Sequence, residues 1–294
     1  MLISIIIRTY NEEKHLHELL EQIKAQQVSD FDVEVVLVDS GSIDNTLVIA
    51  EKHSVNIVHI DKKDFTFGRS LNIGCEAASG EYLVFVSGHC IPCDRNWLHN
   101  LVLPLMQGRF AYTYGRQVGQ QDSKFSEKQL FKKYFPSSGQ NISRQNIFCN
   151  NANAALSKKV WSDYLFDEKL TGLEDMALAK SIVADGHKVG YVANSSVYHI
   201  HEESWHQVRS RYEREAIALQ NIMPEVQVSF ADFIRYYTSS LLFDFGSAIQ
   251  EKVFLKFFGQ IVLFRLMQYW GTYRGNHDHR KMSEELKEEY FYPK

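Results

Sequence analysis

The N-terminal third of the chain alternates between short apolar runs and segments of helical periodicity, and this alternation constrains the fold more than any other feature. The apolar runs lie at 2–8, 33–38, 56–60 and 82–86, and helical patterns lie between them at about 12–27, 46–53 and 69–78. Strands joined by helical crossovers run parallel, and the helices cover the faces of the sheet. We therefore expect an α/β fold with a mostly parallel sheet flanked by helices, and ligands at the carboxyl ends of its strands.

Composition narrows the class of protein. The chain has 294 residues, of which 45% are hydrophobic and 23% are charged, so it can bury a substantial core. A formal net charge of -4 gives no reason to expect a nucleic-acid partner. Cys90 and Cys93 form one Cys-x-x-Cys, but no second pair completes a zinc site, so we expect reduced thiols in a cytoplasmic protein.

The opening residues 1–8 lack a basic region before a short apolar run, which predicts a first strand rather than a signal peptide. After Pro224 the chain becomes rich in aromatic and aliphatic residues. Charged residues such as Asp244 and Arg265 interrupt this region, so we expect no membrane-spanning helix.

We divide the chain into a domain at 1–224, with halves at about 1–100 and 101–224, and a helical appendage at 225–294. Between Phe230 and Trp270, apolar residues recur on one broad helical face beside Lys252 and Lys256. That face could pack on the first domain or on a second subunit of a homo-oligomer. It could also rest on an anionic membrane surface as a peripheral contact.

Two polar segments that interrupt apolar runs carry candidate chemistry. Ser87-Gly88-His89 follows a buried strand and offers a metal ligand at the edge of the sheet, and Glu174-Asp175 offers a general base. Two further segments, Thr9-Tyr10-Asn11-Glu12 and Asp39-Ser40, close the first two strands with small, hydrogen-bonding residues suited to a base and ribose. Each of these two segments could also be an ordinary turn or helix cap.

Taken together, residues 3–215 closely resemble the inverting family 2 glycosyltransferases of GT-A fold, and within them the bacterial rhamnosyltransferase branch. The segments that carry the resemblance are DFTFGRSLNIG at 64–74, AASGEYLVF at 77–85, YGRQ at 114–117, NNANAA at 150–155 and VYHIH at 197–201. The resemblance implies a GT-A, Rossmann-like sheet, followed here by the C-terminal helical appendage.

The resemblance also implies a divalent metal ion, Mn²⁺ or Mg²⁺. The family usually has Asp-x-Asp, or an aspartate at the last position, where this chain has Ser87-Gly88-His89. His89 occupies the last position, and a neutral imidazole can bind such an ion; alternatively, His89 hydrogen-bonds donor phosphate or the loop backbone. His199 and His201 alternate along an extended segment, so we expect only one of them to complete the site, and the resemblance favours His199.

By the same resemblance, Asp175 removes the proton of the acceptor hydroxyl, and Glu174 binds the acceptor or orients the helix that begins there. As an alternative, both are charges favoured at a helix start. The residues expected to hold the nucleotide sugar are Thr9, Tyr10, Asn11, Glu12, Asp39, Ser40, Arg69, Asn72, Ser87, Gly88 and Arg116.

The resemblance predicts an inverting transferase that moves a sugar from a nucleotide donor, dTDP-rhamnose by preference, to a hydroxyl of a bacterial surface glycan such as capsule or O-antigen. A UDP-sugar is the alternative donor. A lipid-linked acceptor would place the protein at the cytoplasmic face of the inner membrane. A contrasting hypothesis, motivated by Ser87 in the metal motif, is a non-catalytic relative that binds nucleotide sugar as a scaffold.

Overall fold

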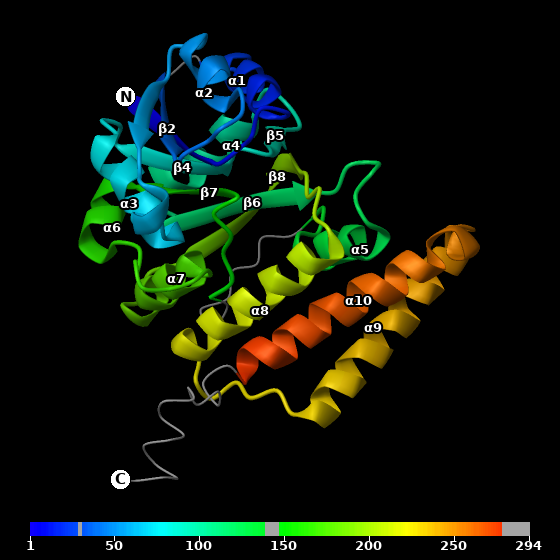
Figure 1. The fold of residues 1–294 in the computed structure, drawn as a ribbon. Coiled ribbons are helices and arrows are strands. Elements are labelled where there is room, and N and C mark those ends of the chain that lie inside the picture. Colours follow the sequence, from blue (N-terminus) through cyan, green and yellow to red (C-terminus); the bar gives the residue numbers. More distant parts are fainter. Residues whose placement is uncertain (29–30, 139–146, 278–294) are drawn as a thin grey trace, which may run out of the picture. The chain divides into compact units, whose positions relative to one another are not determined.

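The structure is a computed structural model that describes residues 1–28, 31–138 and 147–277 (Figure 1). The chain divides into two compact units, one made of 1–123 with 127–202, and the other of 124–126 with the chain from Glu203 onward. Residues 29–30, 139–146 and, in the predicted appendage, 278–294 lie outside the described residues.

The first unit alternates strands and helices as the sequence predicts. Its strands are β1 (Leu2–Thr9), β2 (Asp32–Asp39), β3 (Asn56–His59), β4 (Tyr82–Ser87), β5 (Cys90–Pro92), β6 (Tyr112–Val118), β7 (Asn153–Ser157) and β8 (Val189–His199). Its helices are α1 (Leu16–Lys24), α2 (Thr46–Glu51), the 3-10 helix η1 (Lys62–Asp64), α3 (Phe67–Ala77), α4 (Trp97–Met106), α5 (Phe125–Tyr134) from its third residue onward, α6 (Lys158–Tyr164) and α7 (Glu174–Ala184).

The strands form one 8-stranded sheet in the order β3-β2-β1-β4-β7-β6-β8-β5. The β3-β2-β1-β4 half is parallel, as expected, because each of its strands is joined to the next through a helix. The other half is mixed, since β7 pairs antiparallel with both β4 and β6, and β5 pairs antiparallel with β8. Helices cover both faces of the sheet, so the first unit is a mixed α/β fold.

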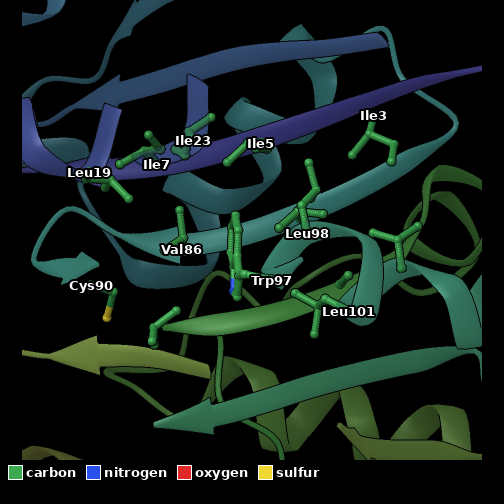
Figure 2. Packing of buried hydrophobic residues seen from close by; sticks show 14 of the residues in the cluster. Ile3, Ile5, Ile7, Leu19, Ile23, Val86, Cys90, Trp97, Leu98 and Leu101 are labelled. Carbon is green, nitrogen blue, oxygen red and sulfur yellow. The ribbon is translucent and has the colours of Figure 1, made fainter. Parts of the chain in front are cut away.

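Side chains of β1 alternate between the two faces of the sheet and therefore enter two separate cores. Ile3, Ile5 and Ile7 contact the core on the side of α1 and α4, where the buried Trp97 fills the space beneath the strands (Figure 2). Ile6 enters the opposite core with residues of α3, α6 and α7. The sheet is thus buried on both faces, which leaves the strand ends as its open edge.

The second unit consists mainly of α8 (Trp205–Ile222), α9 (Phe230–Gln250) and α10 (Phe254–Asn276). Helix α10 packs closely along α8 because Gly271 and Gly275 have no side chain there. A Cβ at Gly275 would lie 2.1 Å from the carbonyl oxygen of Glu213. Helix α8 belongs to the second unit, which therefore begins before the predicted domain boundary at 224.

The helical face predicted between Phe230 and Trp270 is divided between α9 and α10, which form a hairpin in Figure 1. Ile261 is fully buried, and Phe254 and Phe257 pack partly buried against it. That face is the inside of the second unit. Among the described helices, none is both long enough and apolar enough to cross a membrane.

Candidate active site

The carboxyl ends of β1 and β2 form a tightly hydrogen-bonded loop pair. Thr9 lies opposite Asp39 in the parallel register, and its hydroxyl is 3.3 Å from the Asp39 carboxylate. The second carboxylate oxygen of Asp39 accepts from the amides of Gly41 and Ser42 at 2.9 and 3.0 Å. The hydroxyl of Ser40 donates to the carbonyl of Thr9 at 3.1 Å. The first polar segment and the aspartate turn, far apart in sequence, therefore lie at one edge of the sheet.

The loop after β1 is fixed by residues of the second loop. Asn11 adopts φ 57°, an uncommon conformation for a residue other than glycine, and its side-chain oxygen accepts from the amide of Ile43 at 2.9 Å. The amide of Glu12 donates to the hydroxyl of Thr46 at 2.7 Å. Tyr10, by contrast, is 42% exposed and contacts the ammonium group of Lys62. An exposed ring on a rigid loop is suited to stacking on a base.

Three histidines meet at the carboxyl end of β4. One ring nitrogen from each of His89, His199 and His201 lies within 4.8 Å of the others. The ring centroids of His89 and His199 are 5.1 Å apart, and those of His199 and His201 are 4.1 Å apart. The structure thus brings together all three predicted metal ligands. Imidazole nitrogens at this spacing fit a divalent transition ion.

The sheet explains why these histidines meet. The chain turns after Ser87 and enters β5, whose antiparallel register places Cys90 opposite His199. The amide of Ile200 donates to the carbonyl of His89 at 3.2 Å. The expectation that only one of His199 and His201 reaches the cluster is wrong, because β8 ends at His199. Strict alternation of side chains holds only within a strand.

Each histidine of the cluster is held through Nδ1 by an oxygen from a different element. The Nδ1 atoms of His89, His199 and His201 lie 2.7 Å from Oε1 of Glu12, Gln117 and Glu127, respectively. Carboxylate and amide oxygens accept hydrogen bonds, so each Nδ1 donates its proton, and Nε2 is the nitrogen through which a neutral ring would bind a metal. Metal-bound histidines in proteins are commonly oriented in this way.

Glycine at position 88 permits the first of these bonds. A Cβ on Gly88 would lie 2.8 Å from Cγ of Glu12, a distance too short for two carbon atoms. Gly88 therefore acts by allowing the turn after β4 to approach the Glu12 side chain.

Asp175 lies in the first turn of α7 and is 7% exposed. Its carboxylate accepts from the amide of Asn151 at 2.9 Å and from the amide of Met176 at 2.8 Å. Burial, and then the nearby charge of Glu174, raise its pKa to about 7, although the two amides and Arg8 act in the opposite direction. A carboxylate with a pKa near neutrality can accept a proton at physiological pH.

Glu174 contributes differently from its neighbour. Its carboxylate pairs with the guanidinium of Arg8 at 3.2 Å, and Arg8 also contacts the carbonyl and ring of Phe67. Leu173, just before this pair, has φ 57°, so the backbone is strained where the acidic residues begin. Glu174 therefore connects the start of α7 to the end of β1. The sequence analysis did not single out Arg8, because this residue lies within an apolar strand.

The remaining residues predicted to bind the nucleotide sugar differ in exposure and in hydrogen bonding. Arg69 is exposed on α3, and Arg116 is half-buried on β6 with a buried Nε that has no hydrogen-bond partner. Asn72 is buried, and its amide bonds to the backbone of Phe166, to Glu168 and to the indole of Trp161. These four bonds use every donor and acceptor of the amide. Asn72 therefore holds the segment after α6. This argues against the predicted contact of Asn72 with the nucleotide sugar.

A hydrogen-bonded path joins the segment beside Asp175 to the histidine cluster. Gln117 accepts from His199 and donates to the side chain of Asn150 at 2.9 Å, and the next residue, Asn151, bonds to Asp175. Gln117 and the two asparagines belong to segments that carry the resemblance, so a signal was present for them. The sequence gave no signal for Glu127, because a glutamate in a helix with several charged residues is common.

Comparison with known proteins assigns the family. Residues 4–165, more than half of the chain, match the family profile described as glycosyl transferase family 2. The chain belongs to glycosyl transferase family 2. This family 2 glycosyltransferase is 27% identical over 225 residues to the O-antigen chain rhamnosyltransferase RfbN of Salmonella typhimurium strain LT2, covering 72% of the chain and 70% of RfbN.

Solved structures agree on the fold of this glycosyltransferase. The mannosyltransferase PcManGT from Pyrobaculum calidifontis, solved with GDP-Man and Mn²⁺, gives a TM-score of 0.60 at 16% identity, covering 99% of this chain and 87% of that one. Residues 1–349 of TarS from S. aureus, solved with UDP-GlcNAc, give 0.58 at 17% identity, covering 95% and 92%. The predicted GT-A fold is thus confirmed. The family match confirms the predicted enzyme class.

Proposed function

We propose that this glycosyltransferase moves a sugar, by preference rhamnose from dTDP-rhamnose, to a hydroxyl of a bacterial surface glycan, with inversion at the anomeric carbon. The observation that carries this proposal is Asp175, a buried carboxylate with a pKa of about 7 held by two backbone amides. Similarity to RfbN supports an O-antigen acceptor and a rhamnose donor.

In the proposed reaction, the oxygen of the acceptor hydroxyl attacks the anomeric carbon of the donor sugar, and its proton passes to the carboxylate of Asp175. The bond between the anomeric carbon and the diphosphate oxygen breaks as the new bond forms. Its electron pair leaves with the nucleoside diphosphate. Attack from the face opposite the leaving group inverts the anomeric carbon, and the rigid start of α7 holds the base in position for it.

The histidine cluster fits the divalent ion that the fold implies. When bound there, such an ion would supply positive charge against the diphosphate oxygens as the nucleotide departs. His89, His199 and His201 would hold it, while Glu12, Gln117 and Glu127 would keep their rings oriented. The loops around Thr9 and Asp39 would hold the nucleoside, with Tyr10 against its base and the exposed Arg69 near phosphate.

A test is to incubate the purified protein with a divalent ion and dTDP-rhamnose, UDP-glucose, UDP-GlcNAc or GDP-mannose, and to measure release of nucleoside diphosphate with and without rhamnose-terminated acceptors. We expect the fastest release from dTDP-rhamnose and a rate at least about 1,000-fold lower for Asp175→Asn. Faster turnover of a UDP-sugar would replace the proposed donor. Binding of donor without any turnover, including hydrolysis, would favour the scaffold hypothesis.

We also propose that the protein works at the cytoplasmic face of the inner membrane, on a lipid-linked acceptor, through the end of its helical hairpin. Large apolar side chains near the turn between α9 and α10 are exposed, and we call this group the tip patch. Its members are Leu242 at 71%, Phe243 at 60%, Ile249 at 61%, Leu255 at 91% and Phe258 at 49% exposure. Lys252 and Lys256 lie between them, which suits an anionic bilayer.

A further inference from the structure

We infer that the histidine cluster selects a late first-row transition ion of the Co²⁺ and Zn²⁺ class over Mg²⁺ and Mn²⁺, and binds it before any nucleotide arrives. This inference rests on the proposed use of His89, His199 and His201 as a metal site. It adds the chemical class of the ion and the order of binding.

The chemistry of the ligands carries the first part of this inference. The three-residue cluster offers imidazole nitrogens, and the carboxylates of Glu12 and Glu127 lie 2.7 Å from the Nδ1 atoms of His89 and His201. Mg²⁺ and, to a lesser degree, Mn²⁺ prefer oxygen ligands, while imidazole suits Co²⁺, Ni²⁺ and Zn²⁺. Replacement of the family's last aspartate by His89 thus changes the preferred ion without abolishing the site.

The arrangement of the supporting residues carries the second part. Each ring is fixed by an acceptor from a separate part of the fold: the loop after β1, strand β6 and helix α5. The acceptors are themselves held, since the backbone of Glu12 bonds to Thr46 and the amide of Gln117 bonds to Asn150. Glu127 is 3% exposed.

Three protein ligands oriented in advance form a site that does not need substrate oxygens to assemble. A site with one carboxylate would depend much more on the diphosphate of the donor for its remaining ligands. The geometry of the cluster therefore predicts metal binding by the nucleotide-free protein.

The experiment uses the full chain, stripped of metal with a chelator and free of nucleotide. Co²⁺ is titrated while visible absorption is recorded, because a d–d band reports ligand type without any need for activity. Calorimetry then compares Zn²⁺, Mn²⁺ and Mg²⁺ under the same conditions. We expect one Co²⁺ per chain, and Co²⁺ and Zn²⁺ binding tighter than Mg²⁺ by on the order of 100-fold.

Variants assign the site. We expect His199→Ala to abolish the Co²⁺ band, and Glu12→Gln to weaken Co²⁺ binding about tenfold to 100-fold while the band is retained at high Co²⁺. His187→Ala is the matched control, because His187 is an exposed histidine in the turn before β8, outside the cluster. It should leave the titration unchanged. Circular dichroism of each variant checks that the fold is intact.

Equal binding of Mg²⁺ and Co²⁺, or Co²⁺ binding only after dTDP or UDP is added, would overturn the inference. A folded His199→Ala variant with an unchanged Co²⁺ band would also overturn it. The proposed transferase activity is measured separately: turnover that depends on Asp175 but runs equally well in excess chelator would leave that function standing and reject this metal site. Co²⁺ binding by the nucleotide-free protein, without turnover of any sugar donor, would support this metal site and reject the proposed transferase function.

Discussion

The side chain of Gln117 lies 2.7 Å from Nδ1 of His199, and its amide also donates to Asn150 at 2.9 Å. Asn150 precedes Asn151, whose backbone amide donates to Asp175. One glutamine on β6 therefore contacts both the proposed metal site and the segment that holds the proposed base. Its two bonds run in opposite directions, since it accepts from the histidine and donates to the asparagine.

We predict that Gln117→Ala weakens metal binding by about tenfold to 100-fold, because His199 loses the acceptor that fixes its tautomer and ring orientation. Gln117→Glu keeps an acceptor for His199 but loses the donor to Asn150, so we expect it to retain metal affinity within a few-fold while lowering turnover. Calorimetry with Co²⁺ and a turnover assay at saturating Co²⁺ separate the two effects. Equal loss of metal affinity in both variants would contradict this assignment.

The pKa of Asp175 predicts the pH dependence of the reaction. Burial, and then the nearby charge of Glu174, raise that pKa from 3.8 to about 7, and only the deprotonated form can accept a proton. At saturating metal, kcat/KM should therefore rise about tenfold per pH unit below pH 7 and level off above it. The measurement is a pH profile between 5.5 and 8.5, about 1.5 units on either side of neutrality, in constant ionic strength. A flat profile in the wild type would argue against Asp175 as the base.

The hairpin of the second unit contains a buried ion pair. Arg265 donates to both carboxylate oxygens of Asp244 at 2.7 Å and to Gln268 at 2.8 Å, and Asp244 is fully buried. We expect Arg265→Met to lower the free energy of unfolding by about 3–5 kcal/mol, because it leaves a buried carboxylate unpaired. The double variant Asp244→Leu with Arg265→Met should recover most of that loss. Urea denaturation measures both; a double variant as unstable as the single one would contradict the explanation.

Close packing of α10 on α8 depends on two glycines. Since a Cβ at Gly275 would lie 2.1 Å from the carbonyl oxygen of Glu213, Gly275→Ala should force the helices apart and cost about 1–3 kcal/mol. Gly259 is the matched control on the same helix, because nothing lies within 4 Å of its Cβ position. There, alanine should stabilise the helix by up to about 1 kcal/mol. Thermal unfolding of the two variants should shift in opposite directions.

The tip patch predicts binding to anionic vesicles. Changing Leu242, Phe243 and Leu255 to serine removes large exposed apolar groups, so sedimentation with phosphatidylglycerol vesicles should fall at least about tenfold. The control changes Phe230 and Ile234, which are 57% and 43% exposed at the first turns of α9, to serine. Phe254 and Phe257 are unsuitable targets because they pack inside the hairpin. Equal sedimentation of both variants would reject the tip patch as the anchor.

The parallel half of the sheet is predictable from sequence because its central strands, β1 and β4, are buried on both faces and read as apolar runs. The alternation of strands and helices also predicts that Thr9 and Asp39 lie side by side, since they are the last residues of neighbouring strands. The mixed half is less predictable. The pairing of β5 with β8, which brings His89 to His199, involves a three-residue strand that no periodicity could reveal.

Other features depend on contacts between distant residues. His201 joins the cluster because β8 ends two residues earlier, and element ends are set by tertiary packing as much as by local sequence. Asn72 looks like a ligand-binding residue in a family segment, yet its amide is fully used by Trp161, Phe166 and Glu168. Helix α8 belongs to the second unit, where α10, some sixty residues further along the chain, packs closely against it.

Calorimetric titration of dTDP into the chelator-stripped protein, with and without added Co²⁺ or Mn²⁺, measures whether nucleotide binding depends on the metal site. We predict that the ion strengthens dTDP binding at least about tenfold in the wild type, and that this dependence is lost in His199→Ala. We also predict that Asp175→Asn binds dTDP as the wild type does, because the proposed base would contact the acceptor rather than the nucleotide. Binding of dTDP with the same affinity in metal and in chelator would contradict the proposed metal site.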